Sequence, residues 1–423
     1  MTSIKDIKYH YCSSSALVML KYRLSMMKYL VNGKKYPLFS LSNSEGGLSE
    51  SQVLFKKMKT RKFVQHNGNY YFSLSAPHWP SKAFDNMAAN GGLNVAAAGT
   101  LLKHHIDNAI IGITRQCDYN CIHCYEFNNL KKKDTVPVFK LQEVISKLQE
   151  YGVGIITLSG GEPMLRYNDL IQILKEADHS KSDLHIHTSG YGVSRGKAEQ
   201  LKKAGLQAAG IALDDIDPER HDTFRGYRGA WQNAINAIKY FQDAGVFTYV
   251  NMCLTNEIIR SGDIYSYFDL MKTLKVGFIR WLEPKPCGAY LKNEGESCIL
   301  GENERAIATG LYINANTGKS HRDYPVISYE AYVELPANLG CIMGGNSLIY
   351  IDTAGNVEPC VFLPVMFGNI LDEDFSVILE RMKKAIPAPL KKECPAVTLS
   401  NEINDLRKKG HSLPISFKEI KIT

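Results

Sequence analysis

Three cysteines lie close together in the chain, at Cys117, Cys121 and Cys124. Their thiolates are soft ligands of the kind that hold zinc or iron–sulfur clusters. A structural zinc or an iron–sulfur cube takes four protein ligands, so three thiolates would leave one iron of a cube open to another molecule. The spacing therefore indicates a cluster that can bind a small molecule, or a zinc site that His123 or the pair His104 and His105 would complete.

A second motif begins one strand and one helix further along. Residues 154–158 form a short apolar run rich in β-branched side chains, and Gly160, Gly161, Glu162 and Pro163 follow it closely. A buried strand followed by two glycines is typical of a place where the backbone comes close to a ligand. Taken alone, Glu162 could also be a charge that the dipole of a helix N-terminus favours.

Together, the CxxxCxxC run with a ring side chain at His123 and the later Gly-Gly-Glu-Pro resemble the signature of the radical S-adenosylmethionine (radical SAM) family. The resemblance implies a 4Fe–4S cluster on Cys117, Cys121 and Cys124, whose open iron binds the amino and carboxylate groups of SAM. One electron from the reduced cluster then cleaves the sulfonium to give a 5′-deoxyadenosyl radical. This radical abstracts a hydrogen atom from an unactivated position, which is chemistry that proteins delegate to a cofactor.

Two later segments add to the resemblance. The run from Ile186 to Gly190 resembles the strand end that approaches the SAM ribose. Asp214 and the run from His221 to Gly226 resemble the family's Leu-Asp-Gly and His-Asp-x-x-Arg segment, whose arginine commonly faces the SAM carboxylate. Asp215 stands where glycine is usual, so we expect a change in the local turn or on the substrate side of the pocket.

The resemblance places residues from all of these segments around SAM. The arginine of the His-Asp-x-x-Arg segment, Arg225, could instead form a surface ion pair with Asp222, an interaction of small energy. The residues expected to contact SAM are His123, Tyr125, Gly160, Gly161, Glu162, Pro163, Thr188, Ser189, Asp214, Arg225 and Asn251.

From about residue 107, strand-like runs alternate with amphipathic helical patterns such as Leu141, Val144, Ile145 and Leu148. Alternation of this kind predicts an α/β fold with a parallel sheet covered by helices, whose active-site groups follow the C-terminal ends of the strands. The family resemblance implies a partial (β/α)6 TIM-like barrel over residues 106–290. The predicted strands span residues 109–113, 154–158, 184–188, 209–213, 247–254 and 278–282.

The βα rhythm stops after Pro284, and residues 291–423 follow a different pattern. Alternating apolar residues on both sides of the turn at 353–356 predict a β-hairpin. Cys341 precedes this hairpin and Cys360 ends it, so the hairpin would bring two thiolates close together. Such a pair is the beginning of a second metal site.

The hairpin and the later run 367–370 resemble the C-terminal auxiliary-cluster extension called SPASM or, in its short form, twitch. With Cys394 as the third well-placed cysteine, the resemblance implies the short form with one auxiliary cluster. Cys287 and Cys298 are candidates for a fourth ligand or are ordinary thiols. Relatives that dehydrogenate a serine or cysteine place an aspartate base directly after the Pro-Cys, where this chain has Val361, which argues against that oxidation.

Residues 1–105 predict a small α+β region. Residues 49–59 could form a helix, and 62–65 with 70–72 predict a hairpin through the turn at 67–69. A helix followed by such a hairpin is compatible with a winged-helix-like module that grips a leader peptide. It is equally compatible with a cap on the barrel.

Composition limits the location and the partners. The apolar stretch 15–30 is interrupted by Lys21, Arg23 and Lys28, so no membrane span or signal peptide is expected. Ten cysteines in separated groups fit a reducing cytoplasm better than a disulfide framework. The net charge of +7 is spread along the chain, and the lysines at 131–133 could steer an acidic substrate or form a surface loop. No aromatic interleaving indicates nucleic-acid binding.

These patterns predict an anaerobic radical SAM enzyme with a SAM-cleaving 4Fe–4S cluster and one auxiliary iron–sulfur cluster. The expected substrate is a peptide or protein side chain, with a small molecule such as a sugar, cofactor precursor or lipid as the alternative. An electron donor such as flavodoxin or ferredoxin would reduce the cluster. The rival hypothesis is an iron–sulfur regulator that binds nucleic acid, against which the intact Gly-Gly-Glu-Pro speaks, since a sensor has no need to hold SAM.

Overall fold

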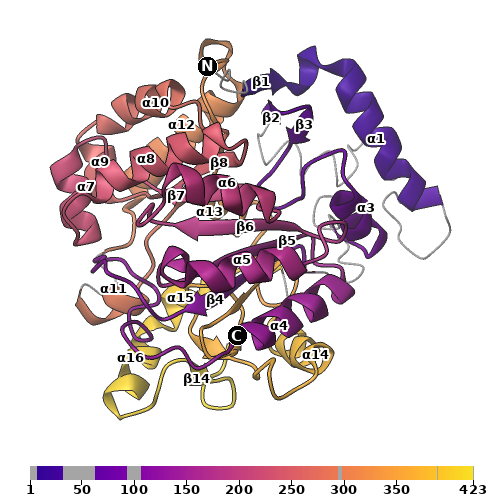
Figure 1. The fold of residues 1–423 in the computed structure, drawn as a ribbon. Helices are drawn as coiled ribbons and strands as arrows, with labels where there is room; N and C mark the ends of the chain where they lie inside the picture. Colours follow the sequence, from indigo (N-terminus) through magenta and orange to yellow (C-terminus); the bar gives the residue numbers. More distant parts are fainter. Residues whose placement is uncertain (1–6, 32–61, 93–105, 294–297, 388, 423) are drawn as a thin grey trace, which may run out of the picture.

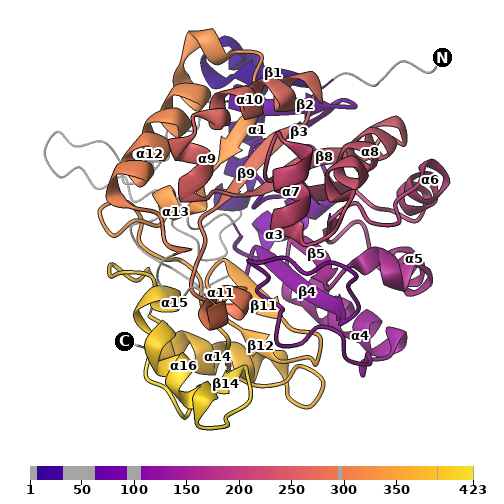
Figure 2. The same ribbon diagram turned by 90° about the vertical axis from the view of Figure 1, so that its left-hand side faces the viewer.

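The computed structural model describes residues 7–31, 62–92, 106–293, 298–387 and 389–422 (Figures 1 and 2). Within these ranges the largest element is a nine-stranded sheet of order β10-β9-β8-β7-β6-β5-β4-β11-β12. All neighbouring strands in it are parallel except β11 and β12, which form an antiparallel pair. The predicted α/β class with a parallel sheet is therefore confirmed.

The six predicted barrel strands form in chain order and lie side by side. Their buried residues run without a break along most of each strand, as expected for parallel strands covered on both faces. Their bounds are β4 (Asn108–Thr114), β5 (Ile155–Gly160), β6 (Asp183–Thr188), β7 (Ala208–Ala212), β8 (Phe247–Cys253) and β9 (Phe278–Leu282). Each agrees with its predicted run to within two residues.

Helices follow the strands and cover the outer face of the sheet, as Figure 2 shows for α4, α5, α6 and α8. In α4 the four residues of the predicted apolar stripe, at 141, 144, 145 and 148, are all buried in the main core. The helices of this layer are α4 (Val138–Tyr151), α5 (Tyr167–Glu176), α6 (Arg195–Lys203), α7 (Pro218–Arg225), α8 (Ala230–Asp243), α9 (Asn256–Arg260), α10 (Asp263–Thr273) and α12 (Glu302–Thr317).

The tail contributes strands to both edges of the barrel sheet. β10 (Val326–Ser328) pairs with β9, and β11 (Leu348–Ile351), the first strand of the predicted hairpin, pairs in parallel with β4. The sheet therefore takes strands from both sides of residue 290. The other tail elements are β12 (Val357–Glu358), β13 (Val365–Met366), β14 (Ile415–Ser416), α11 (Gly288–Asn293), α13 (Glu330–Val333), α14 (Phe375–Ala385), α15 (Pro395–Thr398) and α16 (Ser400–Lys408), with the short 3-10 helix η5 (Lys319–His321).

The N-terminal region forms a separate three-stranded sheet at the opposite end of the molecule from α14 and α16 (Figures 1 and 2). The predicted hairpin is β2 (Lys62–His66) and β3 (Asn69–Tyr71), whose turn residues Asn67 and Gly68 both have positive φ, as a tight hairpin turn requires. β1 (Lys8–Tyr11), which the sequence did not predict, pairs with β2. The helices of this region are α1 (Ala16–Val31) and α3 (Lys82–Ala89), with η1 (Cys12–Ser14), and the helix predicted at 49–59 lies outside the described residues.

This N-terminal sheet packs against the first residues of the barrel strands. Val64 and Tyr71 share a buried cluster with Phe247 and Phe278, and the rings of Tyr71 and Phe247 stack at 3.7 Å between centroids. The contact lies at the end of the barrel opposite to the C-terminal strand ends. None of the described helices is long and apolar enough to cross a membrane.

Candidate functional site

The predicted motifs meet around the C-terminal ends of adjacent strands. The cysteine loop follows β4, Gly160 ends β5, Thr188 ends β6, Asp214 comes shortly after β7, and Asn251 lies near the end of β8. In a parallel sheet these ends share one edge, and loops there can surround a single ligand. The fold therefore brings together the segments that the sequence separates by more than a hundred residues.

Two glycines let other segments pack tightly on the cysteine loop. A Cβ at Gly161 would collide with the carbonyl of Gln116, and a Cβ at Gly288 would collide with the carbonyl of Cys124. The backbone N–H of Ala289 donates to that same Cys124 carbonyl at 2.9 Å. The start of α11 thus lies directly on the loop, which fixes the loop's path past the third cysteine.

The three thiols of the loop are poorly hydrated. Burial raises the pKa of Cys117 to about 12 and raises the pKa of Cys124 well above its ordinary value. Thiolates in such a place need a nearby positive charge, which a bound metal supplies. The donor set is therefore suited to hold iron rather than to act as free thiolates.

No three Cys, His, Asp or Glu side chains in the described ranges surround one point as a single metal ion requires. A 4Fe–4S cube needs wider spacing, because each thiolate binds a different iron. The half-buried His123 ring stacks on Phe224 at 4.3 Å between centroids, and within the described ranges it does not join the thiols around one point. His104 and His105, the other candidate zinc ligands, lie outside the described residues. The three thiols on one loop fit a cube.

Glu162 ties the glycine motif to the end of β6. One carboxylate oxygen accepts the Thr188 hydroxyl at 2.8 Å and the Met164 N–H at 3.0 Å. The other accepts the backbone N–H and the hydroxyl of Ser189 at 2.8 and 2.6 Å. Burial raises the pKa of Glu162, while these hydrogen bonds act in the opposite direction. Its bond to Met164 caps the short 3-10 helix η3 (Pro163–Arg166), so the predicted charge at a helix N-terminus is also present.

Asp214 and Arg225 form a buried ion pair beside the cysteine loop. The Arg225 Nε donates to Asp214 Oδ2 at 2.7 Å, and the two side chains are 11% and 5% exposed. Burial would raise the pKa of Asp214, but the charge of Arg225, together with His123, His221 and the Cys253 N–H, outweighs it and holds that pKa below the usual value. The alternative surface pair with Asp222 is wrong, because the Asp222 carboxylate accepts backbone N–H groups at the start of α8 instead.

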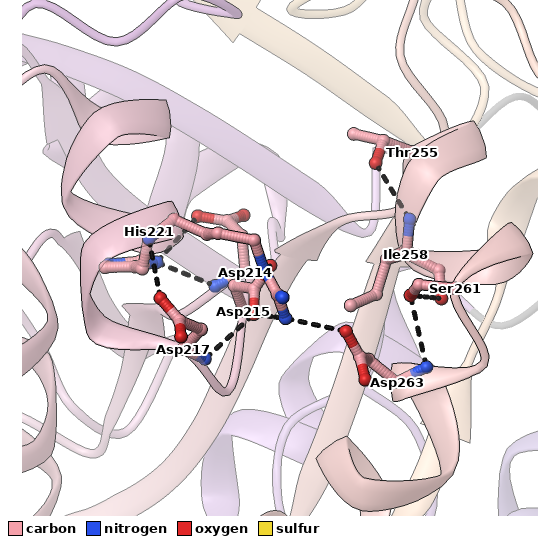
Figure 3. A network of polar contacts seen from close by, with 9 residues as sticks. Asp214, Asp215, Asp217, His221, Thr255, Ile258, Ser261 and Asp263 are labelled. Carbon is pink, nitrogen blue, oxygen red and sulfur yellow. Dashed lines mark hydrogen bonds and ion pairs between the residues drawn. The ribbon is translucent and has the colours of Figure 1, made fainter.

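Asp215, which replaces the usual glycine, points away from this pair. It accepts two hydrogen bonds from Arg220 at 2.8 and 2.9 Å, and Arg220 also contacts Asp263 at 2.7 Å. Figure 3 shows that the Arg220 guanidinium joins Asp215 to Asp263. In this view Asp263 lies to the right of Asp215, and Asp217 and His221 lie to the left. The substitution therefore adds a surface network between α7 and α10.

Two further predicted SAM contacts lie on the inner side of the sheet. The Tyr125 hydroxyl and the Ser159 hydroxyl are 3.1 Å apart. Asn251 is buried, and its side-chain oxygen has no hydrogen-bond partner in the described structure. A Cβ at Gly210 would come within 2.8 Å of the Asn251 side-chain nitrogen, so a glycine is needed beneath it.

The tail thiols form a second group. Cys341 exchanges two backbone hydrogen bonds with Leu390, at 2.8 and 3.0 Å. Burial raises the pKa of Cys287, and the nearby Cys360 and Cys394 raise it further, which places these thiols in one neighbourhood. Cys298 contributes to the same effect. The structure thus places Cys287 and Cys298, which the sequence left open, within electrostatic range of the predicted ligands Cys360 and Cys394.

Residues 111–261 match the family model of the radical SAM superfamily. The chain is a radical SAM enzyme. Its cofactors are accordingly a 4Fe–4S cluster and SAM.

Relatives of this radical SAM enzyme act on different substrates. It is 25% identical over 67% of its length to the Fe-coproporphyrin III synthase of Methanosarcina barkeri, covering 76% of that protein. It is also 25% identical over 64% of its length to the subtilosin biosynthesis protein AlbA of Bacillus subtilis, covering 59% of AlbA. Streptococcus suis SuiB, solved with its precursor peptide SuiA, shares the fold with a TM-score of 0.51 and 18% identity, over 66% of this chain and 64% of SuiB. The chain therefore spans less than two thirds of AlbA and of SuiB.

The radical SAM barrel also holds polar side chains that the sequence reasoning missed. The His187 imidazole is 3.0 Å from the Tyr249 hydroxyl and 3.5 Å from the Arg280 guanidinium. Among the described residues, the side-chain atoms His185 Nε2, Asn251 Oδ1 and Arg280 Nε are buried without a hydrogen-bond partner. The signal was present as polar residues alternating with apolar ones in β6, β8 and β9, which marks a polar inner face.

Proposed function

We propose that this radical SAM enzyme modifies a peptide or protein side chain by hydrogen-atom abstraction. The observation that carries the proposal is the meeting of Cys121, Glu162 and the Asp214–Arg225 pair around one edge of the sheet. A 4Fe–4S cluster with SAM at its open iron supplies one-electron cleavage of the sulfonium and so a 5′-deoxyadenosyl radical.

In this proposal Cys117, Cys121 and Cys124 hold the cluster. Glu162, fixed by four donors, orients the Gly160–Gly161 backbone toward the SAM amino group. The SAM contacts proposed beside it are His123, Tyr125, Pro163, Thr188, Ser189, Asp214, Arg225 and Asn251. Their common location on one edge of the sheet supports this assignment.

We also propose an auxiliary cluster held by Cys341, Cys360 and Cys394, with Cys287 as the fourth ligand. Cys287 immediately precedes α11, whose first residues lie on the cysteine loop, so the two clusters would share one structural element. Four protein ligands favour an electron-carrying or structural role over a cluster with an open iron.

The proposed organisation is an N-terminal cap (1–105), a barrel (106–290) and an auxiliary-cluster region (291–423). The cap is supported by the packing of Val64 and Tyr71 against the barrel strands. Lys62 joins the cap to the region after residue 290, since its ammonium donates to the carbonyls of Ala315, His321 and Tyr324 at 2.8–3.2 Å.

The substrate would enter the polar inner face of the barrel. A haem precursor is the second candidate, because the Fe-coproporphyrin III synthase is among the relatives and Arg280, whose side chain is 14% exposed, could receive a carboxylate. Peptide processing has the support of AlbA and of SuiB, which share sequence and fold with this chain. Reduction by a flavodoxin or ferredoxin completes the proposal.

The test begins with anaerobic purification. Two cubes would give about eight irons per chain, and changing Cys117, Cys121 and Cys124 together to alanine should remove about half. Stoichiometric zinc in a colourless protein would overturn the proposal. Reduced enzyme with SAM should form 5′-deoxyadenosine, and deuterium should pass into it from a labelled substrate. Peptides encoded by neighbouring genes and a set of iron porphyrin haem precursors, tested side by side, distinguish the two substrate classes.

A further inference from the structure

The last turn of α7 runs alongside the cysteine loop. The backbone N–H of Asn120 donates to the Arg225 carbonyl and that of Ile122 to the Phe224 carbonyl, both at 3.2 Å. Phe224 also stacks on the His123 ring, which stands directly before the third cysteine. These contacts join the loop to the helix end, so a side chain from α7 is held at a defined place beside the thiols.

Arg225 is the charged side chain at this place. Its Nη1 lies 3.9 Å from the Cys121 sulfur, within range of an N–H···S hydrogen bond, while its Nε donates to Asp214. The guanidinium is a planar fork, so one nitrogen can be anchored while another points at a second acceptor. The contact to sulfur is therefore set by the anchor on Asp214.

Asp214 is itself fixed on several sides. Its second oxygen accepts the Cys253 backbone N–H at 2.9 Å, and its own N–H donates to His221 Nδ1 at 3.2 Å. The Tyr267 hydroxyl donates to the neighbouring Leu213 carbonyl at 2.6 Å. An anchor with this many bonds from β8, α7 and α10 leaves Arg225 little freedom to move away from the sulfur.

We propose that Arg225 is a positioning residue that hydrogen-bonds the Cys121 thiolate and raises the reduction potential of the SAM-binding cluster. Reduction adds negative charge to the cluster, and a buried cation with an N–H···S bond stabilises that charge. The proposal rests on the proposed function, because it assumes that Cys121 is a cluster ligand. It adds a role that acts before SAM is bound.

The effect of Arg225 on the cluster potential can be distinguished by experiment from a contact between Arg225 and the SAM carboxylate. A carboxylate contact affects the cluster only when SAM is present, whereas the bond to Cys121 acts in its absence. The cluster potential measured without SAM therefore reports on the thiolate contact alone.

The experiment is a potentiometric titration of the reconstituted enzyme without SAM, followed by electron paramagnetic resonance. The cluster in question is the one whose signal is lost when its three cysteines are changed to alanine. Arg225→Met should shift its potential to more negative values by about 59 mV, a tenfold change in the one-electron equilibrium. Arg220→Met is the matched control, because Arg220 lies on the same helix but pairs with Asp215 and Asp263 at the surface. The cluster in this variant should have the same reduction potential as in the wild type.

An unshifted SAM-free potential in Arg225→Met, at unchanged iron content, would overturn the proposal even if SAM binding weakened. If that variant does not hold the cluster, Arg225→Lys decides. The shorter, unforked lysine side chain cannot reach both Asp214 and Cys121, so the cluster potential in this variant should also be more negative than in the wild type. A potential equal to that of the wild type would refute the role of Arg225. Failure of the wild-type chain to bind iron would instead overturn the proposed function.

Discussion

Ser189 donates both its backbone N–H and its hydroxyl to the same carboxylate oxygen of Glu162, at 2.8 and 2.6 Å. The bond pair joins the segment after β5 to the segment after β6. Because Glu162 is buried, its charged carboxylate needs these donors to replace the hydrogen bonds of water. The donors in turn need the carboxylate as their acceptor. The glycine motif and the end of β6 consequently form one rigid wall of the site.

Glu162→Gln should weaken SAM binding about tenfold or more while leaving iron content unchanged. The amide cannot accept from all four donors, and a lost charged hydrogen bond costs about 1.5–3 kcal/mol. Equilibrium binding of SAM to the anaerobic enzyme measures the effect. Glu143→Gln, an exposed change on α4, is the control and should bind normally. Equal affinity in both variants would show that Glu162 has no part in SAM binding.

Cys287→Ala should lower the iron content of the auxiliary site and abolish substrate modification. Slow, substrate-free cleavage of SAM should survive, because the first cluster has its own three ligands. Cys298→Ala, at the rival candidate for the fourth ligand, is the comparison and should retain its iron. If Cys298→Ala loses iron and Cys287→Ala does not, the fourth ligand has been misassigned.

Arg280→Met should abolish substrate modification but preserve substrate-free cleavage of SAM. Arg280 has long contacts, 3.4 Å to the Leu74 carbonyl, 3.5 Å to His187 and 3.6 Å to Glu330, so a substrate group can become its main partner. Parallel assays of 5′-deoxyadenosine and of modified product measure the split. If a folded Arg280→Met variant loses both substrate modification and substrate-free cleavage of SAM, Arg280 does not act specifically on the substrate.

The stability of the chain should depend on pH through Lys62. Burial lowers the pKa of Lys62 to about 7, with the charge of Asp323 acting in the opposite direction. The unfolded lysine titrates near 10.4, so between about pH 7 and 10.4 the unfolded chain binds more protons. The free energy of unfolding should therefore rise with pH across this window through Lys62, by a few kcal/mol at most.

Denaturant unfolding of the wild type and of Lys62→Met at several pH values measures this contribution. The difference in free energy of unfolding between the two should grow with pH in favour of the wild type. Lys8→Met, at an exposed position of β1, should follow the wild type. Parallel curves for wild type and Lys62→Met would show that the ammonium, held by its three carbonyls, keeps an ordinary pKa.

Local sequence determined the barrel strands and the N-terminal hairpin. Each strand is a short β-branched or small-residue run between turn signals, and the turn at Asn67 and Gly68 fixes its own hairpin. The triad at 117–124 could be recognised because all three thiols lie on one loop. In each case the information is held within a few neighbouring residues.

Only the tertiary structure decided which distant groups meet. Arg225 pairs with Asp214 rather than with Asp222 because the end of α7 lies on the cysteine loop within reach of Asp214. The Asp222 carboxylate instead accepts a backbone N–H of α8. Cys287 joins thiols from the far end of the chain, and β10 adds to an edge that no local pattern marked. Side-chain pairing across a sheet depends on strand order and helix orientation, which are properties of the whole packed chain and are not encoded in any single segment.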